Sequence, residues 1–231
     1  MWFPMLVGSN ERRYAWQDEG LASFLTDLAI RARNPDHNPG RSTQHAYLND
    51  VEAGGEVELM RHADLYPDYS SFAAASYTKA SMLLHTLNAL LGDEVFRRAL
   101  REYGARWSFR HPQPHDFWNT FEDVAGRDLD WFWSPWFFET WTLDQAIADV
   151  RPGGDSLDIL IEDRGLAPMP VRLAVTRADG RVERIEVPVD VWLRGARRHT
   201  LRIAARPGVT RVEIDPEGVF PDVDRGNQVW K

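Results

Sequence analysis

Apolar residues recur at helical spacing through the first part of the chain. A stripe of leucines between residues 83 and 91 predicts a helix over 76–91, and Gly92 follows it as a stop signal. Asp93 is placed to cap a second helix, whose apolar residues Phe96, Ala99 and Tyr103 again follow the helical period.

Two further helices are expected before residue 144. Phe117, Phe121 and Val124 mark one of them, which ends at Gly126. The aromatic stretch 128–141 reads as another, in which Pro135 must either kink the helix or start it afresh. The stretch 35–41 holds two prolines and a glycine and is expected to be a loop.

After residue 145 the period of the apolar residues changes from helical to two. The alternation predicts strands, and Asp179-Gly180 between two of them is a hairpin signal. Short strands at this spacing favour a small antiparallel β-sandwich. The expected fold is therefore α+β, with a helical domain at 1–144 and a β-sandwich at 145–231. The alternating apolar residues are Leu157, Ile159, Ile161, Val171, Leu173, Val175, Val187, Val189, Val191, Leu201, Ile203, Val212 and Ile214.

Composition excludes several classes of partner and of site. A net charge of −8 with no basic patch argues against nucleic acid. No apolar run approaches the length of a membrane span, so no transmembrane segment is expected. The absence of cysteine excludes disulfides and thiolate metal sites. The ten tryptophans and eleven phenylalanines fall mostly before residue 142, which predicts an aromatic-rich core or a large cleft there.

Asp18 and Glu19 stand side by side before Gly20, at the start of an apolar helix. On spacing alone, these acids fit the helix dipole, and Asp18 fits an N-cap. Glu19 as a metal ligand is the alternative. Histidine gives no further metal site by spacing, because none of the seven lies in an HExxH motif. The pair His111 and His115 is interrupted by prolines that prevent a shared helical face.

The segment Trp16-Gln17-Asp18-Glu19-Gly20-Leu21-Ala22 resembles the one that supplies the third zinc ligand in gluzincin aminopeptidases of the aminopeptidase N type. Asp18 and Leu21 depart from the family's usual Asn and Phe. The Trp2-Phe3-Pro4-Met5 start is similar to the continuation of the family's HExxH helix, with Pro4-Met5 in place of Gly-Asn. In the family's spacing, the second His would stand immediately before Met1.

The Tyr77-Thr78-Lys79-Ala80 segment is similar to the family's Tyr-Glu-Lys-Gly motif, with Thr78 for Glu and Ala80 for Gly. In the family this tyrosine donates a hydrogen bond to the oxyanion of the tetrahedral intermediate, which is physically suited to a phenol. Tyr77 is thus the expected catalytic residue, and Tyr66 and Tyr69 are fallbacks. A core tyrosine near a helix start is the structural alternative.

The resemblance implies a fold and a chemistry. The helices would form the C-terminal lobe of a thermolysin-like metallopeptidase domain, followed by the β-sandwich. Glu19 would bind zinc together with two His ligands upstream of Met1. The intact parent would use a zinc-activated water to remove N-terminal residues from a peptide substrate. One carboxylate cannot hold a catalytic zinc, so this chain alone is expected to be inactive.

Three interpretations follow from the sequence. The chain is a fragment of a zinc aminopeptidase, which is the interpretation that the break inside the metal site favours. It is a non-catalytic, peptidase-like module that binds a partner or a peptide. Or it is part of a split enzyme, in which a complementing chain carries HExxH.

Overall fold

The computed structural model describes residues 3–231, and the chain separates into two compact units. The first ends at Thr140, and the second comprises Trp141–Lys231. The sequence pattern placed the boundary after residue 144. Helices make up the first unit and antiparallel sheets dominate the second, so the expected α+β class is confirmed. None of the helices in the described part of the chain combines the length and apolar character that crossing a membrane requires.

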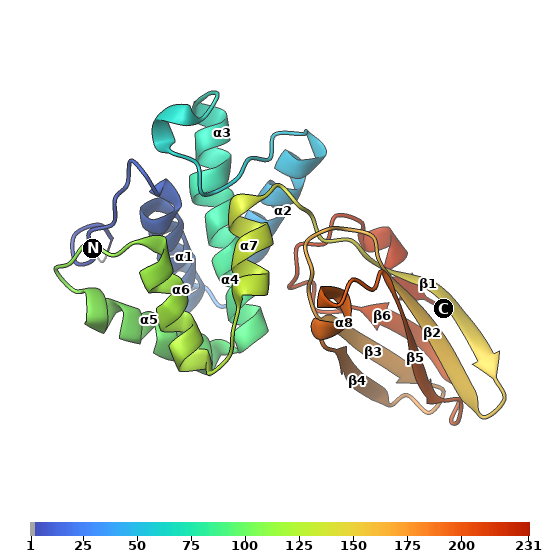
Figure 1. Ribbon diagram of the computed structural model, residues 1–231. Coiled ribbons are helices and arrows are strands. Elements are labelled where there is room, and N and C mark those ends of the chain that lie inside the picture. Colours follow the sequence, from blue (N-terminus) through green and yellow to red (C-terminus); the bar gives the residue numbers. More distant parts are fainter. Residues whose placement is uncertain (1–2) are drawn as a thin grey trace. The chain divides into compact units, whose positions relative to one another are not determined.

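The first unit is built from helices that pack around α4 (Figure 1). This helix contacts α1, α2 and α5, and its residues Leu83, Leu84 and Leu87 are buried. The helices of this unit are α1 (Ala15–Arg33), α2 (Pro39–Glu52), η1 (Ala63–Leu65), α3 (Tyr69–Ala73), η2 (Ala74–Lys79), α4 (Ala80–Leu91), α5 (Asp93–Trp107), α6 (Pro114–Ala125) and α7 (Asp130–Phe138).

Aromatic side chains fill the core of the first unit, as their density in the sequence predicted. Trp16 stacks on Trp118 with an interplanar angle of 4°. Phe117 contacts Trp16 edge-on and also packs on Phe121. Each such ring buries a large apolar area, and edge-to-face or offset contacts add to that stabilisation. The core therefore fixes the start of α1 against α6.

Several helix boundaries differ from the sequence prediction. The leucine helix does not begin at residue 76, because α3, η2 and α4 follow one another without a break from Tyr69. Asp93 is not the N-cap of α5. Gly92 holds that position, and Asp93 accepts a hydrogen bond from Asn88. The expected loop 35–41 ends early, since Asn38 caps α2 and Pro39 starts it, where its missing N–H costs nothing.

The other helix signals behave as the pattern indicates. Gly92 and Gly126 both take positive φ angles, which glycine adopts without strain, and end α4 and α6. Pro135 lies inside α7, which runs on through it over Asp130–Phe138 and is shorter than the predicted 128–141.

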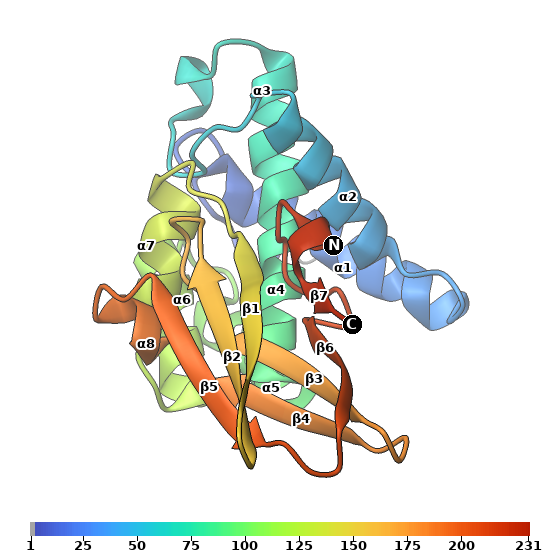
Figure 2. The ribbon, with the colours of Figure 1, turned by 90° about the vertical axis from the view of Figure 1, so that its right-hand side faces the viewer.

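The second unit consists of two antiparallel sheets (Figure 2). One has the strand order β1-β2-β5 and the other the order β4-β3-β6-β7. Ile159 and Ile161 from β2 share one core cluster with Leu173 and Val175 from β3. The elements are β1 (Gln145–Gly153), β2 (Ser156–Asp163), β3 (Val171–Arg177), β4 (Val182–Val187), α8 (Asp190–Leu193), β5 (Arg198–Ala204), β6 (Val209–Ile214), η3 (Arg225–Asn227) and β7 (Val229–Trp230).

The strand prediction holds with one correction. β3 pairs with β4 through the turn at Asp179-Gly180, and Gly180 has a φ of 84°. The alternation fails at Val189 and Val191, because β4 ends at Val187 and these two residues belong to the short helical segment around α8, whereas the later alternating residues lie in β5 and β6. Here the apolar spacing of two was misleading, since Val189 and Val191 pack against the core from a helical turn.

Candidate functional site

Glu19 lies in the first part of α1, which is anchored by buried neighbours. Trp16 and Gln17 are buried, and Gln17 donates a hydrogen bond from its side chain to the hydroxyl of Tyr103 at 2.8 Å. Glu19 itself is partly exposed. The interpretation of Asp18 as the N-cap is wrong, because Tyr14 occupies that position. Asp18 instead stands in the first turn, where its charge suits the helix dipole.

Tyr77 lies in η2, a π-helical turn between α3 and α4. The N–H of Ala80, at the end of this turn, donates to the carbonyl of Ala75, which is five residues earlier. Such turns are rare and occur frequently at functional sites, because one extra residue per turn redirects the side chains. No local pattern in the sequence indicated this widening.

Gly20 explains how α1 comes so close to this turn. A Cβ placed on Gly20 would stand 2.4 Å from the Cβ of Ala80 and 3.4 Å from the carbonyl oxygen of Ser76. No larger residue fits that space without moving a helix. The neighbouring residue on α1, Glu19, is thereby held against the turn that carries Tyr77.

The hydroxyl of Tyr77 lies within reach of the carboxylate of Glu19, to which a phenol can donate. Burial raises the pKa of Tyr77, and the neighbouring carboxylate of Glu19 raises it further. Tyr69 and Asp18 contribute in the same direction. The phenol therefore keeps its proton at neutral pH and remains a hydrogen-bond donor.

Asp18 adds a second acid beside this pair. Its side chain is buried, and burial together with the charges of Glu19 and Glu11 raises its pKa to about 6. Two adjacent carboxyl groups at one helix start thus differ in environment. Asp18 is directed into the protein, and Glu19 reaches the phenol.

The two fallback tyrosines have other surroundings. Tyr66 donates its hydroxyl to the carbonyl of Glu58 at 3.3 Å, and Tyr69 is 77% exposed. Phe72 connects them to the candidate site, because its ring contacts Tyr66, Tyr69 and Tyr77. Of the three candidates, Tyr77 is the one whose pKa the carboxylate of Glu19 raises. The roles of Glu19 as a metal ligand and Tyr77 as a catalytic donor stay predictions.

The donor set around Glu19 is short of a complete zinc site. Within residues 3–231, no group of three His, Cys, Asp or Glu ligand atoms includes Glu19. A catalytic zinc takes three protein ligands and an open position. Glu19 therefore fits one ligand position and no more. Met1 and Trp2, at the start of the segment that resembles the continuation of the family's HExxH helix, lie outside the described residues.

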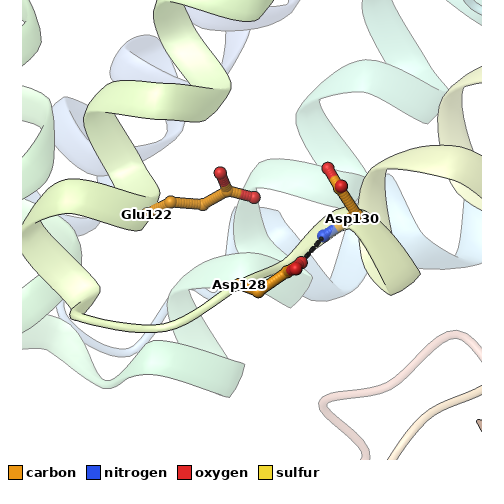
Figure 3. Close-up of side chains that lie close together, drawn as sticks. All are labelled: Glu122, Asp128 and Asp130. Atoms are coloured by element: carbon orange, nitrogen blue, oxygen red, sulfur yellow. Dashed lines mark hydrogen bonds between the residues drawn. The ribbon is translucent and has the colours of Figure 1, made fainter.

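A group of three carboxylates does occur elsewhere in the described chain, at the start of α7 (Figure 3). Their ligand atoms lie within 4.8 Å of one another. Glu122 accepts hydrogen bonds from the N–H of Leu129 and the indole of Trp133, and Asp128 accepts one from the N–H of Asp130. Because these bonds satisfy backbone donors where a helix begins, the group is accounted for by helix capping.

Sequence reasoning missed the buried ion pair at the end of the π turn. Lys79 is buried and pairs with Glu56 at 2.8 Å. Lys79 stood out in the sequence as one of two lysines in an arginine-rich chain. Its partner carried no signal, because Glu56 lies in an irregular stretch and its proximity arises from tertiary folding alone.

Comparison with known proteins identifies the family. The Peptidase family M1 domain matches residues 1–136. Aminopeptidase M1-C of Oryza sativa subsp. japonica is 28% identical over an alignment of 170 residues that covers 68% of this chain and 18% of that protein. Aminopeptidase N of Lactococcus lactis subsp. lactis is 26% identical over 144 residues, covering 58% of this chain and 17% of the relative.

A solved structure shares the fold. The crystal structure of Legionella pneumophila aminopeptidase A in complex with aspartic acid matches with a TM-score of 0.58 and 16% identity. It covers 90% of this chain, which corresponds to 24% of that protein. The chain thus spans less than a quarter of the proteins it matches. With more than half of its residues within the matched domain, the chain belongs to peptidase family M1, the aminopeptidase family that its Glu19 and Tyr77 segments resemble.

Proposed function

We propose that this chain contributes to the active site of a zinc aminopeptidase that hydrolyses N-terminal residues from peptides. Glu19 is one zinc ligand, and Tyr77 is the oxyanion donor. Two histidines of an HExxH segment, which the described residues do not include, complete the ligand set. The observation that carries the proposal is the close contact of α1 with η2 at Gly20, which brings Glu19 near the phenol of Tyr77 although the two residues lie far apart in sequence.

The chemistry of the two residues supports these roles. Zinc, when bound in such a site, polarises the scissile carbonyl and activates a water molecule. A carboxylate is an ordinary zinc ligand. Tyr77 keeps its proton at neutral pH because burial and Glu19 raise its pKa, so its phenol is available to donate to an oxygen on which negative charge develops.

The reading frame upstream of the Met1 codon gives the first test. An HExxH motif ending immediately before Met1 supports the interpretation of the chain as a fragment of a zinc aminopeptidase. A stop codon there, together with a separate promoter for this chain, contradicts that interpretation and favours a binding module. Copurification of a second polypeptide that carries HExxH supports the split enzyme.

The roles of the two residues are tested in an active assembly, either the complete natural protein or a fusion of the preceding segment of Lactococcus lactis aminopeptidase N to this chain. Zinc content and turnover of an aminoacyl fluorogenic substrate are measured. We expect Glu19→Gln to lose zinc. Tyr77→Phe should keep zinc and lower kcat by about 100-fold or more, because one oxyanion donor is removed.

Matched controls separate the roles from folding. Tyr14→Phe removes a phenol at the N-cap of α1 that has no role in the proposed chemistry, and it should leave kcat unchanged. Tyr66→Phe and Tyr69→Phe test the fallbacks. If either of these lowers kcat as much as we expect for Tyr77→Phe, while Tyr77→Phe does not, the assignment of Tyr77 is wrong. The chain assayed alone should show no turnover.

A further inference from the structure

A buried ion pair joins the last residue of the π turn, Lys79, to Glu56. The Nζ atom of Lys79 is 2.8 Å from a carboxylate oxygen of Glu56, and the two side chains are 2% and 9% exposed. Tyr47 of α2 donates its hydroxyl to the same carboxylate at 3.0 Å. The three side chains form a continuous chain from α2 to the last residue of η2, which we call the Tyr47–Glu56–Lys79 network.

Lys79 also bonds to two backbone segments. Its ammonium group donates to the carbonyl of Val57 at 3.3 Å and to the carbonyl of Glu139, just after α7, at 3.1 Å. With Glu56 this makes three acceptors for the three protons that an ammonium group carries. The end of the π turn is therefore tied to α2, to the stretch around residue 57 and to the end of α7.

Stability alone is a poor explanation for such a pair. Burial of two charges carries a large desolvation cost, which well-packed apolar residues of similar size do not have. Burial lowers the pKa of Lys79, although Glu56 and Glu58 oppose that shift. The best-attested use of buried polar groups is to fix one register where apolar contacts would allow several.

The register that this network fixes is that of Tyr77. Tyr77 precedes Lys79 by two positions, and side chains two positions apart on a helical turn point in nearly opposite directions. The network holds one side of η2, and Gly20 and Glu19 of α1 meet the other. A π turn has an α-helical alternative with different side-chain directions, so its geometry needs an external constraint.

We propose that the Tyr47–Glu56–Lys79 network is a positioning device, which holds η2 as a π turn so that the Tyr77 hydroxyl meets Glu19. Lys79 and Glu56 are positioning residues and act through Tyr77. The proposal rests on the proposed function only in the use it assigns to this geometry, which is to place Tyr77 as the oxyanion donor. The geometry itself can be measured without zinc or activity.

The experiment compares Lys79→Met with the double variant Lys79→Met/Glu56→Leu in the full chain. Thermal unfolding reports stability. The second readout is the NMR spectrum of protein with labelled tyrosine rings, in which the six tyrosines give separate signals and Tyr77→Phe identifies that of Tyr77. Glu19→Gln shows where the Tyr77 signal moves when its carboxylate partner is lost.

Lys79→Met leaves Glu56 buried without its counter-charge, and the midpoint should fall by on the order of 10 °C. The double variant removes both charges and should recover most of that loss. We nevertheless expect its Tyr77 signal to leave the wild-type position, by more than the signal of Tyr14 does. If stability recovers while the Tyr77 signal stays displaced, the network positions Tyr77 and does not merely stabilise the fold.

One result overturns the proposal. If the double variant is as stable as the wild type and its Tyr77 signal stays at the wild-type position, the network has no positioning role. Should Lys79→Met fail to fold, the double variant and the milder Glu56→Gln, which keeps an oxygen acceptor for Tyr47, carry the same comparison. Failure of the aminopeptidase assay would leave this result readable, since neither readout uses substrate or metal.

Discussion

The two units bury ionisable groups in different ways. In the second unit, two buried carboxylates bind backbone N–H groups at chain reversals. Asp222 accepts from Gln145 and Asp224, and Asp215 accepts from Val219 and Phe220. In the first unit, the ionisable groups around η2 interact with one another, as Glu19 does with Tyr77 and Lys79 with Glu56.

This difference separates structural acids from candidate chemistry. A carboxylate that satisfies several backbone donors replaces the hydrogen bonds that a strand or helix would otherwise supply. Its role is complete within the fold. A carboxylate that meets a phenol at the edge of a partly exposed turn keeps lone pairs for another partner. We therefore expect substitutions of the two buried acids in the second unit to affect stability alone, and those around η2 to change the geometry of Tyr77 as well.

In the second unit, the largest expected loss of stability follows Asp215→Ala. The substitution leaves two buried N–H groups without an acceptor and separates Arg225 from a carboxylate 2.9 Å away. We expect the free energy of unfolding to fall by about 3 kcal/mol, measured by urea unfolding followed by circular dichroism.

Asp215→Asn is the matched control, because it keeps an oxygen acceptor and tolerates the positive φ of 43° at this position. It should lose less than Asp215→Ala. Asp158→Ala breaks an exposed pair with Arg202 and should change stability little. Equal losses in Asp215→Ala and Asp158→Ala would remove the contrast between buried and exposed acids.

A smaller loss is expected in the first unit from Gly20→Ala. The added Cβ would stand 2.4 Å from that of Ala80, so α1 must move away from η2. We expect a loss of about 2 kcal/mol, which overpacking imposes and which the better helix propensity of alanine only partly offsets. The same displacement should move the NMR signal of the Tyr77 ring.

Two variants check that the effect arises at this contact. Gly55→Ala adds a Cβ whose nearest neighbour is 3.5 Å away, an ordinary contact, and should cost little. Ala80→Gly in the Gly20→Ala background removes the clashing atom and should return the Tyr77 signal toward its wild-type position. If the Tyr77 signal does not return, Gly20 is needed for its backbone conformation and not for the room that its missing side chain leaves beside Ala80.

Sequence reasoning found what local patterns encode. The leucine stripe, the glycine stops and the period of two located α4, α6 and most strands, because side-chain burial repeats with the geometry of each element. The prediction failed where the same local pattern occurs in two kinds of secondary structure. Val189 and Val191 alternate like a strand but lie at a helical turn, and α2 is polar enough to give no apolar period at all.

The candidate site shows the same limit. Glu19 and Tyr77 were singled out because their neighbours resemble family motifs. The π turn, the contact of Gly20 with Ala80 and the pairing of Lys79 with Glu56 left no local trace, since each depends on residues from separate segments. Tertiary contacts therefore decide the geometry that motif residues alone leave open.

The smallest effect concerns pH and Asp163 of β2. Burial raises the pKa of Asp163 from 3.8 to about 6, more than the charge of Arg197 lowers it, and its Oδ1 atom has no hydrogen-bond partner among the described residues. The folded state keeps this proton up to about pH 6, whereas the unfolded chain loses it near 3.8. Between these values the folded state binds more protons, so the contribution of Asp163 to stability rises as the pH falls.

Asp163→Asn cannot titrate and removes this contribution. We therefore expect the free energy of unfolding of the wild type, relative to that of Asp163→Asn, to rise by about 1 kcal/mol between pH 7 and pH 5. Urea unfolding of both proteins at each pH measures the difference. Asp179→Asn is the control of opposite sign, because hydrogen bonds from Arg181 lower the pKa of Asp179 and acidification should bring no such gain. A relative stability that stays constant or falls toward pH 5 would mean that Arg197 outweighs burial and keeps Asp163 charged. Asp163 would then be held by charge pairing with Arg197, as Glu56 is by Lys79 in the first unit.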